Sequence, residues 1–188
     1  INEFEEMHRL AKVARPDICV ITNIGFCHLE NLIDRDGVLR AKTEMFDFMR
    51  DGAQIILNGD DDKLITVQNV KGITPVFFGL TERHDYYATD VHSLGLKGTS
   101  CILHLPNGTV NANIHLPGAH MVYNALAGAC VGYSLGLTNE EIQKGIESLL
   151  PVSGRNNLIE TDDFLIIDDC YNANPVSMKA SLDVLSNA

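Results

Sequence analysis

The sequence predicts an α/β protein whose sheet is mostly parallel and has an antiparallel edge segment. Three short apolar runs, at residues 17–22, 53–58 and 74–79, are typical of buried parallel strands. Helical segments separate them, and this order favours parallel pairing through right-handed crossovers. Residues 85–116 instead alternate polar and apolar positions between turns, as antiparallel strands do.

The spacing of apolar residues predicts the two helices of the first half. Residues 3–14 form the first, which ends before Pro16, and its predicted inward face is Phe4, Met7, Leu10 and Val13 or Ala14. Residues 37–51 form the second, and its predicted inward residues are Val38, Leu39, Met45, Phe46 and Met49. Gly52 stops this helix, and a short helix is expected after the second strand, where NGDDDKL follows.

Turn and capping signals organise the second half. LPNGT, at 105–109, predicts a hairpin. Residues 118–137 predict a buried helix rich in small residues that ends at Gly136. In the next helix, Thr138 and Glu141 have the spacing of a capping box.

A polar linker, PVSGRNN at 151–157, marks a predicted domain boundary. We therefore expect one domain at residues 1–152 and the start of a second at 153–188. FLIID predicts the first strand of that second domain. Asn174 and Pro175 suit the N-cap and first position of its first helix.

The composition excludes some classes of function. The 188 residues are 45% apolar and 21% charged, as in ordinary globular proteins. A net charge of −11 argues against a nucleic-acid or anionic-membrane surface. Five scattered cysteines without a CxxC pair favour a reducing compartment, and no apolar run is long enough to span a membrane. Because the chain starts with Ile and ends within a predicted helix, we expect a piece of a longer protein.

Polar residues at the first strand end form the first candidate site. His28 lies in the loop TNIGFCHLE, and Lys42 follows fourteen residues later on the next helix. A neutral histidine is a common metal ligand, and a lysine carbamylated by carbon dioxide becomes an oxygen ligand suited to Mg²⁺. The alternative is a loop histidine with a solvated helical lysine, which these two residues alone favour.

Three further groups are candidates with equally plain alternatives. Asp60, Asp61 and Asp62 follow a strand and suit a metal, although capping of the next helix is favoured. His120 and Asn124 share one helical face. The Asn124 amide can form hydrogen bonds with the edge of an adenine base, and the alternative is a capping turn with one polar residue that the helix tolerates. The last group is the linker arginine Arg155 with the strand-end carboxylates Asp168 and Asp169, which suit a phosphate and a ribose hydroxyl or a solvated hinge.

The order of these motifs resembles the Mur ligase family. The matching runs are PDICVITNIGFCHLE, AKTE, ILNGDDD, GAHMVYNALAG, GR and IDDCYNANPVSM. The resemblance covers nearly all 188 residues and is weakest in 81–116. TNIG…HLE and YNANP are most similar to members that add D-alanyl-D-alanine.

The resemblance implies a fold and an activity. It implies an ATPase-like central domain followed by the first strand and helix of a Rossmann-like C-terminal domain. It implies that ATP activates the terminal carboxylate of UDP-MurNAc-tripeptide as an acyl phosphate, which the amine of D-Ala-D-Ala then attacks. Mg²⁺ would neutralise the crowded oxyanions. The reaction belongs to peptidoglycan synthesis, and thus to cell-wall biogenesis, cell shape and cell division, in the cytoplasm.

The same resemblance assigns roles in the first domain by position. His28 matches a metal-binding histidine. Lys42 matches the lysine that is carbamylated in relatives and supports Mg²⁺. Asn124 matches the asparagine that contacts the nucleotide, with His120 beside it.

Near the domain boundary the resemblance assigns the remaining roles. Arg155 matches an arginine that meets ATP phosphate, and Asp169 an aspartate on the ribose or hinge side of the nucleotide. Tyr171, Asn172 and Asn174 lie in a loop expected near the adenine or the dipeptide. A monomer is expected.

The sequence also departs from the family. It has no G-x-x-G-K-[ST] phosphate loop, and Cys170 stands where serine is more usual. We therefore expect a chain of these 188 residues alone to lack ligase activity. Two alternatives stay open: another Mur-type, cyanophycin-type or folylpolyglutamate-type amide ligase, and a non-catalytic binding module with this fold.

Overall fold

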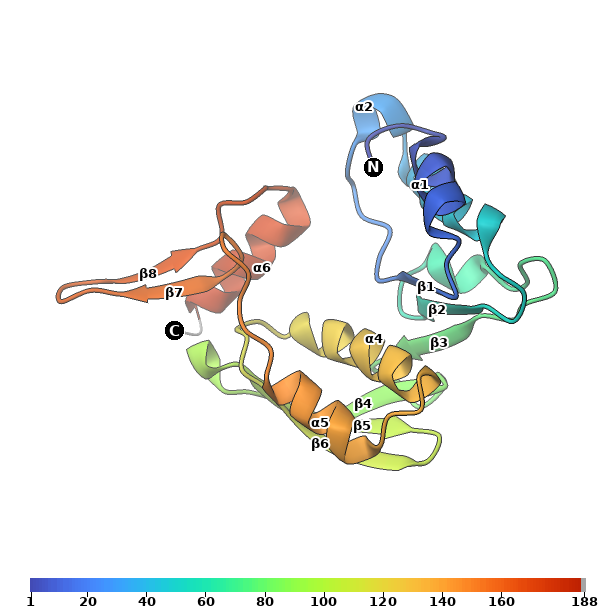
Figure 1. Cartoon of the computed structure of the whole chain (residues 1–188). Helices are drawn as coiled ribbons and strands as arrows, with labels where there is room; N and C mark the ends of the chain where they lie inside the picture. The colour runs from blue at the N-terminus through green and yellow to red at the C-terminus, as the bar shows by residue number, and fades with distance from the viewer. Residues whose placement is uncertain (187–188) are drawn as a thin grey trace. The chain divides into compact units, whose positions relative to one another are not determined.

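The computed structural model describes residues 1–186, which divide into two compact units (Figure 1). The first unit is Ile1–Tyr87 and the second begins at Ala88. Six strands follow one another in the hydrogen-bonded order β1-β2-β3-β4-β5-β6, and the division between the units falls within β4. Across residues 1–186, every helix is too short or too polar to cross a membrane.

The first unit is the parallel part of the fold. Its elements are α1 (Glu6–Ala14), β1 (Ile18–Ile21), α2 (Leu29–Leu32), α3 (Arg35–Thr43), η1 (Glu44–Phe48), β2 (Gln54–Asn58), η2 (Leu64–Thr66), β3 (Val76–Gly79) and the start of β4 (Tyr86–Ser93). β1 pairs with β2, β2 with β3 and β3 with the start of β4, all in parallel. These pairings confirm the three predicted buried strands.

The core of this unit lies between the sheet and α3 with η1. Ile55 and Leu57 of β2 have no exposed surface, and neither has Val38 of α3. The predicted inward side chains of residues 37–51 pack into or against this core. The helix itself begins earlier than predicted, because Asp34 caps it through the backbone N–H of Gly37, and it narrows to the 3₁₀ helix η1 after Thr43.

The predicted inward face of α1 is partly wrong. Leu10 is 55% exposed and Val13 is 87% exposed, whereas Ala11 is buried. The helix is rotated because His8 faces η1, where its ring lies 4.7 Å from that of Phe48. A histidine that packs on an aromatic ring therefore sets the face that apolar periodicity alone misplaces.

β3 and β4 are joined by only six residues although they are parallel. Phe78 pairs with Tyr86, so the chain has little distance to return. His84 in this connection is buried, and its Nε2 lies 2.9 Å from Asp60 Oδ1. A Cβ atom added at Gly59 would lie 2.3 Å from the His84 ring, and one at Gly79 would lie 2.5 Å from it. The two glycines thus leave the space that the ring occupies.

The second unit contains the antiparallel edge and three helices. Its elements are the rest of β4, η3 (Gly95–Lys97), β5 (Thr99–Leu105), β6 (Gly108–Ile114), α4 (Met121–Ser134), α5 (Asn139–Glu147), β7 (Asn157–Glu160), β8 (Leu165–Asp168) and α6 (Pro175–Ser186). β5 and β6 form the predicted hairpin, and α4 and α5 pack on them (Figure 1). The first residues of β4, predicted as antiparallel, instead pair in parallel with β3 despite the short connection.

Capping in the second unit follows the prediction, but the last strand does not. Thr138 and Glu141 form the capping box, and Asn174 caps α6 by accepting from the backbone of Val176 and Ser177. FLIID forms the strand β8, but it is not the first strand beyond the linker, and its Leu165 and Ile166 are about half exposed whereas Ile167 is partly buried. The pairing of β8 with β7, a strand that the sequence did not reveal, is antiparallel.

Candidate functional site

The loop after β1 carries the first predicted site. Lys42, on α3, directs its Nζ to the carbonyl oxygen of Asn23 at 2.8 Å. His28 lies further along the same loop and is exposed. The structure therefore brings the lysine onto the loop that carries the histidine, at the carbonyl five residues before it.

His28 has a backbone conformation that is uncommon for a residue with a side chain. Its φ is 54°, in the left-handed region, and it precedes the four-residue helix α2. Ile33, directly after α2, also has a positive φ, of 73°. Such conformations cost about 1 kcal/mol or more each and persist where surrounding contacts hold the chain.

The three aspartates after β2 have separate structural tasks. Asp61 Oδ1 accepts from the backbone N–H groups of Lys63 and Leu64, which is the predicted capping role. Asp60 accepts from the N–H of Leu80 at 2.6 Å. Asp62 forms two hydrogen bonds with the Arg35 guanidinium, and this pairing lowers the pKa of the Asp62 carboxyl.

The structure fits a metal ion only in part. Among residues 1–186, no three His, Cys, Asp or Glu side chains are grouped so that they could hold a metal ion. His28 and a carbamylated Lys42 would supply an imidazole nitrogen and carboxylate oxygens, which suit Mg²⁺ as partial ligands. Further ligands would have to come from outside this set.

The start of α4 carries the second predicted site, in the second unit. A Cβ atom at Gly118 would lie 2.5 Å from His120 Cε1, so the absence of a side chain at this position leaves room for the His120 ring. The surrounding protein lowers the pKa of His120, and the charge of Asp169 opposes that shift. Asn124 is exposed, and its Nδ2 contacts Met121 Sδ at 3.4 Å. The structure thus places Asp169 within electrostatic range of His120.

Asp169 is also part of the local structure. Its carboxylate accepts from the backbone N–H of Asn156 at 3.3 Å and from the hydroxyl of Ser181 on α6. These contacts join the linker, the end of β8 and the last helix. The carboxylate that the sequence assigned to a nucleotide therefore also holds these three segments together.

Arg155 and Tyr171 are neighbours. The guanidinium carbon of Arg155 lies 4.3 Å from the centre of the Tyr171 ring, a cation–π contact on the surface. The backbone N–H of Tyr171 donates to the carbonyl of Gly154 at 3.1 Å. Asn172 accepts from the N–H of Ala173 through its own side chain. The Tyr171 end of the predicted loop is thus held close to the linker.

The sequence did not single out two residues that hold the first site. Asn58 Nδ2 donates to the carbonyl of Thr22 at 3.0 Å, and Arg35 Nε donates to the carbonyl of Ile24 at 2.8 Å. Asn58 ends a strand next to Thr22, so adjacency of parallel strand ends could have indicated it. Arg35 has no such signal, since it begins a helix eleven residues away.

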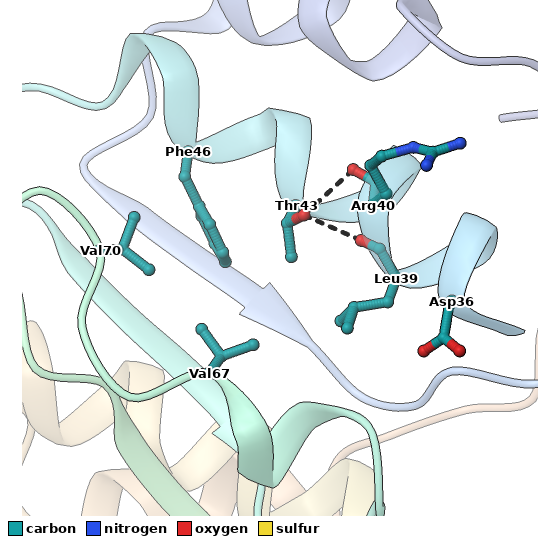
Figure 2. Close-up of a pocket in the computed structure, with 7 residues that line it drawn as sticks. All are labelled: Asp36, Leu39, Arg40, Thr43, Phe46, Val67 and Val70. Atoms are coloured by element: carbon teal, nitrogen blue, oxygen red, sulfur yellow. Dashed lines mark hydrogen bonds between the residues drawn. The ribbon is translucent and has the colours of Figure 1, made fainter.

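A pocket of about 420 Å³ opens beside α3, within the first unit (Figure 2). Its polar groups are already engaged: Asp36 pairs with Lys63 at 2.6 Å and Arg40 lies over the Phe4 ring. Its lining includes neither His28 nor Lys42, and consists of Asp36, Leu39, Arg40, Thr43, Phe46, Val67 and Val70. We therefore assign the candidate site to the loop after β1 rather than to this pocket.

Comparison with known proteins identifies relatives along the whole chain. Residues 1–132 match the family model described as the Mur ligase middle domain. The UDP-N-acetylmuramoyl-tripeptide–D-alanyl-D-alanine ligase of Escherichia coli (strain K12) is 34% identical over 188 residues, which cover 98% of this chain and 41% of that protein. The chain thus spans about two fifths of the length of the curated relatives it matches.

Solved structures give the same result. The crystal structure of MurF from Acinetobacter baumannii matches all of this chain with a TM-score of 0.93 and 33% identity, over 41% of its own length. MurF ligase from Thermotoga maritima in complex with ADP matches 99% of this chain with a TM-score of 0.81 and 28% identity, over 43% of its own length. These matches confirm the predicted mixed α/β fold.

Proposed function

The chain belongs to the Mur ligase family, and we propose that the protein containing it is an ATP-dependent ligase that adds D-alanyl-D-alanine to UDP-MurNAc-tripeptide. The observation that carries this proposal is the similarity to a ligase of this name over 98% of the chain. Contact between Lys42 and the loop of His28 supports it, because the two motifs meet in space.

The reaction forms one amide bond in two steps. The γ-phosphoryl group of ATP moves to the terminal carboxylate of the tripeptide and gives an acyl phosphate and ADP. The amine of D-Ala-D-Ala attacks the acyl carbon, and the tetrahedral intermediate expels phosphate and forms the amide. Mg²⁺ supplies charge neutralisation when bound. His28 and carbamylated Lys42 would contribute to holding it.

The second unit carries the residues that we propose to contact the nucleotide. Asn124 and His120 are proposed to contact the base or ribose, and Arg155 a phosphate. Asp169, Tyr171 and Asn172 would lie on the ribose or dipeptide side. Exposure of Asn124, Arg155 and Tyr171 supports these roles, because a nucleotide can reach them.

The remaining parts of the proposal concern organisation. We place the domain boundary after residue 152, and β7 and β8 form a separate sheet beyond it. We propose a cytoplasmic location, which agrees with the five free thiols because a reducing compartment keeps cysteines unpaired. We further propose that the protein is a monomer.

Phosphate release from Mg-ATP tests the function. The experiment uses the full-length gene product that contains these 188 residues, with UDP-MurNAc-tripeptide and either D-Ala-D-Ala or single amino acids. We expect release that requires the dipeptide. Lys42→Ala should lower the rate at least a hundredfold, because a carbamate then cannot form. Lys63→Ala, which removes a lysine paired with Asp36, is the matched control and should retain the rate.

The same assay with other amines tests the two alternative functions. Release that requires a single amino acid, or glutamate on a folate acceptor, would assign the chain to another amide ligase of this fold. Nucleotide binding without release in the presence of any amine would favour a non-catalytic binding module and would contradict the proposal.

A further inference from the structure

We infer that Arg35 and Asp61 are positioning residues that clamp the Ile24 peptide and thereby fix the loop of Asn23 and His28 against Lys42. This inference rests on the proposed function, because it concerns the site that Lys42 and His28 would form. Neither residue of the clamp is proposed to touch substrate, nucleotide or metal. Their effect would reach the site through the backbone.

Both backbone polar groups of Ile24 are held by side chains. Asp61 Oδ2 accepts from its N–H at 2.7 Å, and Arg35 Nε donates to its carbonyl oxygen at 2.8 Å. The two side chains also face each other, with 3.8 Å between Arg35 Nη2 and Asp61 Oδ2. The Asp61 side chain is 8% exposed and that of Arg35 is 22% exposed. Shielding from water makes these charged hydrogen bonds stronger than surface ones.

The clamp completes a series of three consecutive carbonyl groups, each held by a side chain from another element. Asn58 donates to the carbonyl of Thr22, Lys42 to that of Asn23 and Arg35 to that of Ile24. A loop backbone lacks the partners that a strand or helix provides, so these side chains define its path. The Asn23 carbonyl that receives Lys42 belongs to the same peptide group as the Ile24 N–H, which donates to Asp61.

The contact between Lys42 and Asn23 suits both forms of the lysine. Carbamylation adds CO₂ to the neutral amine and releases a proton, so that R–NH₂ + CO₂ gives R–NH–COO⁻ + H⁺. The product keeps one N–H, which can donate to the same carbonyl and orient the carboxylate. A displaced carbonyl would leave that group without its orienting partner.

The two oxygens of Asp61 allow a selective test. Oδ1 accepts from the N–H groups of Lys63 and Leu64, whereas Oδ2 accepts from that of Ile24. In Asp61→Asn the amide oxygen can keep the turn, and the NH₂ group then opposes the Ile24 N–H. Arg35→Lys keeps the positive charge but loses the Nε donor. This variant therefore removes the hydrogen bond to the Ile24 carbonyl, whereas Asp61→Asn removes the one from the Ile24 N–H.

The experiment uses the full-length gene product and two readouts that need no ligase activity. Amide hydrogen exchange at Ile24 reports the clamp, and the ¹³C signal of a carbamate formed from ¹³C-bicarbonate reports Lys42. We expect Asp61→Asn and Arg35→Lys each to exchange Ile24 at least tenfold faster and to lose at least half of the carbamate signal. Asp17→Asn, which breaks the exposed pair with Arg50, is the control and should change neither.

Each result separates the clamp from the proposed function. Unchanged carbamate signal and Ile24 exchange in both variants would overturn the inference, even if the wild type is an active ligase. Loss of folding in both variants would overturn it too, because the pair would then support the whole unit. Absence of dipeptide-dependent phosphate release in the wild type would instead contradict the function, while the exchange data would still decide the clamp.

Discussion

The loop after β1 and the segment from residue 153 to 186 both carry predicted site residues, but they are held differently. In the loop, the holding side chains come from far along the chain: Asp61 lies 37 residues from Ile24, and Asn58 lies 36 from Thr22. In the later segment, contacts such as those of Asn172 with Ala173 and of Asn174 with Ser177 are local.

This difference separates a loop held by packing across the first unit from a segment held mainly by contacts within itself. The loop rests on β2, whose Ile55, Ile56 and Leu57 are completely buried, so its geometry depends on tertiary packing. The later segment exposes apolar residues of β7, β8 and α6, and its side chains contact residues within the same segment, such as Asp169 with Asn156 and with Ser181. Local contacts preserve a shape without fixing its position, whereas contacts distant in sequence fix both.

The largest expected effect comes from matched truncations in the two regions. Leu57→Ala should lower the free energy of unfolding by about 4 kcal/mol, because a completely buried side chain leaves a cavity. Leu165→Ala, at a side chain 47% exposed, should cost under about 1 kcal/mol. Urea denaturation measures both. Equal losses would contradict the comparison, since the later segment would then be as tightly packed as the first core.

Alkaline pH should distinguish the two regions through their cysteines. Burial raises the pKa of the Cys19 thiol from 9.0 to about 11. Because the folded pKa lies above the unfolded one, this stability is complete below about pH 9 and is lost as the pH rises through 11. This difference between the unfolded and folded pKa values corresponds to about 3 kcal/mol in the free energy of unfolding.

The measurement is the free energy of unfolding between pH 8 and 11.5. Cys19→Ala should make this dependence shallower, although Cys101, whose pKa burial also raises to about 11, continues to contribute. Cys170→Ala should change it less, because that thiol is exposed. An unaltered slope in Cys19→Ala would mean that Cys19 ionises as easily in the folded as in the unfolded chain.

The smallest expected effect tests the proximity of Asp169 and His120. Burial lowers the pKa of His120 and the Asp169 charge partly offsets this. Asp169→Asn removes the offset, so the pKa of His120 should fall further. An NMR titration of the imidazole measures it, with Asp183→Asn, on the exposed side of α6, as control. A rise, or no change, would show that the two groups do not interact.

The sequence by itself determined the elements whose causes are local. The apolar runs of β1, β2 and β3, the hairpin at Pro106 and Asn107, the capping box of Thr138 and Glu141 and the cap at Asn174 were all predicted correctly. Periodicity, turn chemistry and capping act over a few residues, so they are visible in sequence. The ordered motifs likewise indicated the family, because each motif is a contiguous run of residues.

Only the tertiary structure decided which groups meet. The rotation of α1 follows from His8 packing on Phe48, and the pairing of β8 with β7 is one that no sequence pattern indicated. Arg35 is a partner of Ile24 because the start of α3 lies beside the loop after β1. Each outcome depends on contacts between residues that are far apart in sequence, and a local sequence pattern carries no information on the energies of such contacts. The clamp on the loop of Asn23 and His28 depends on contacts of the same kind.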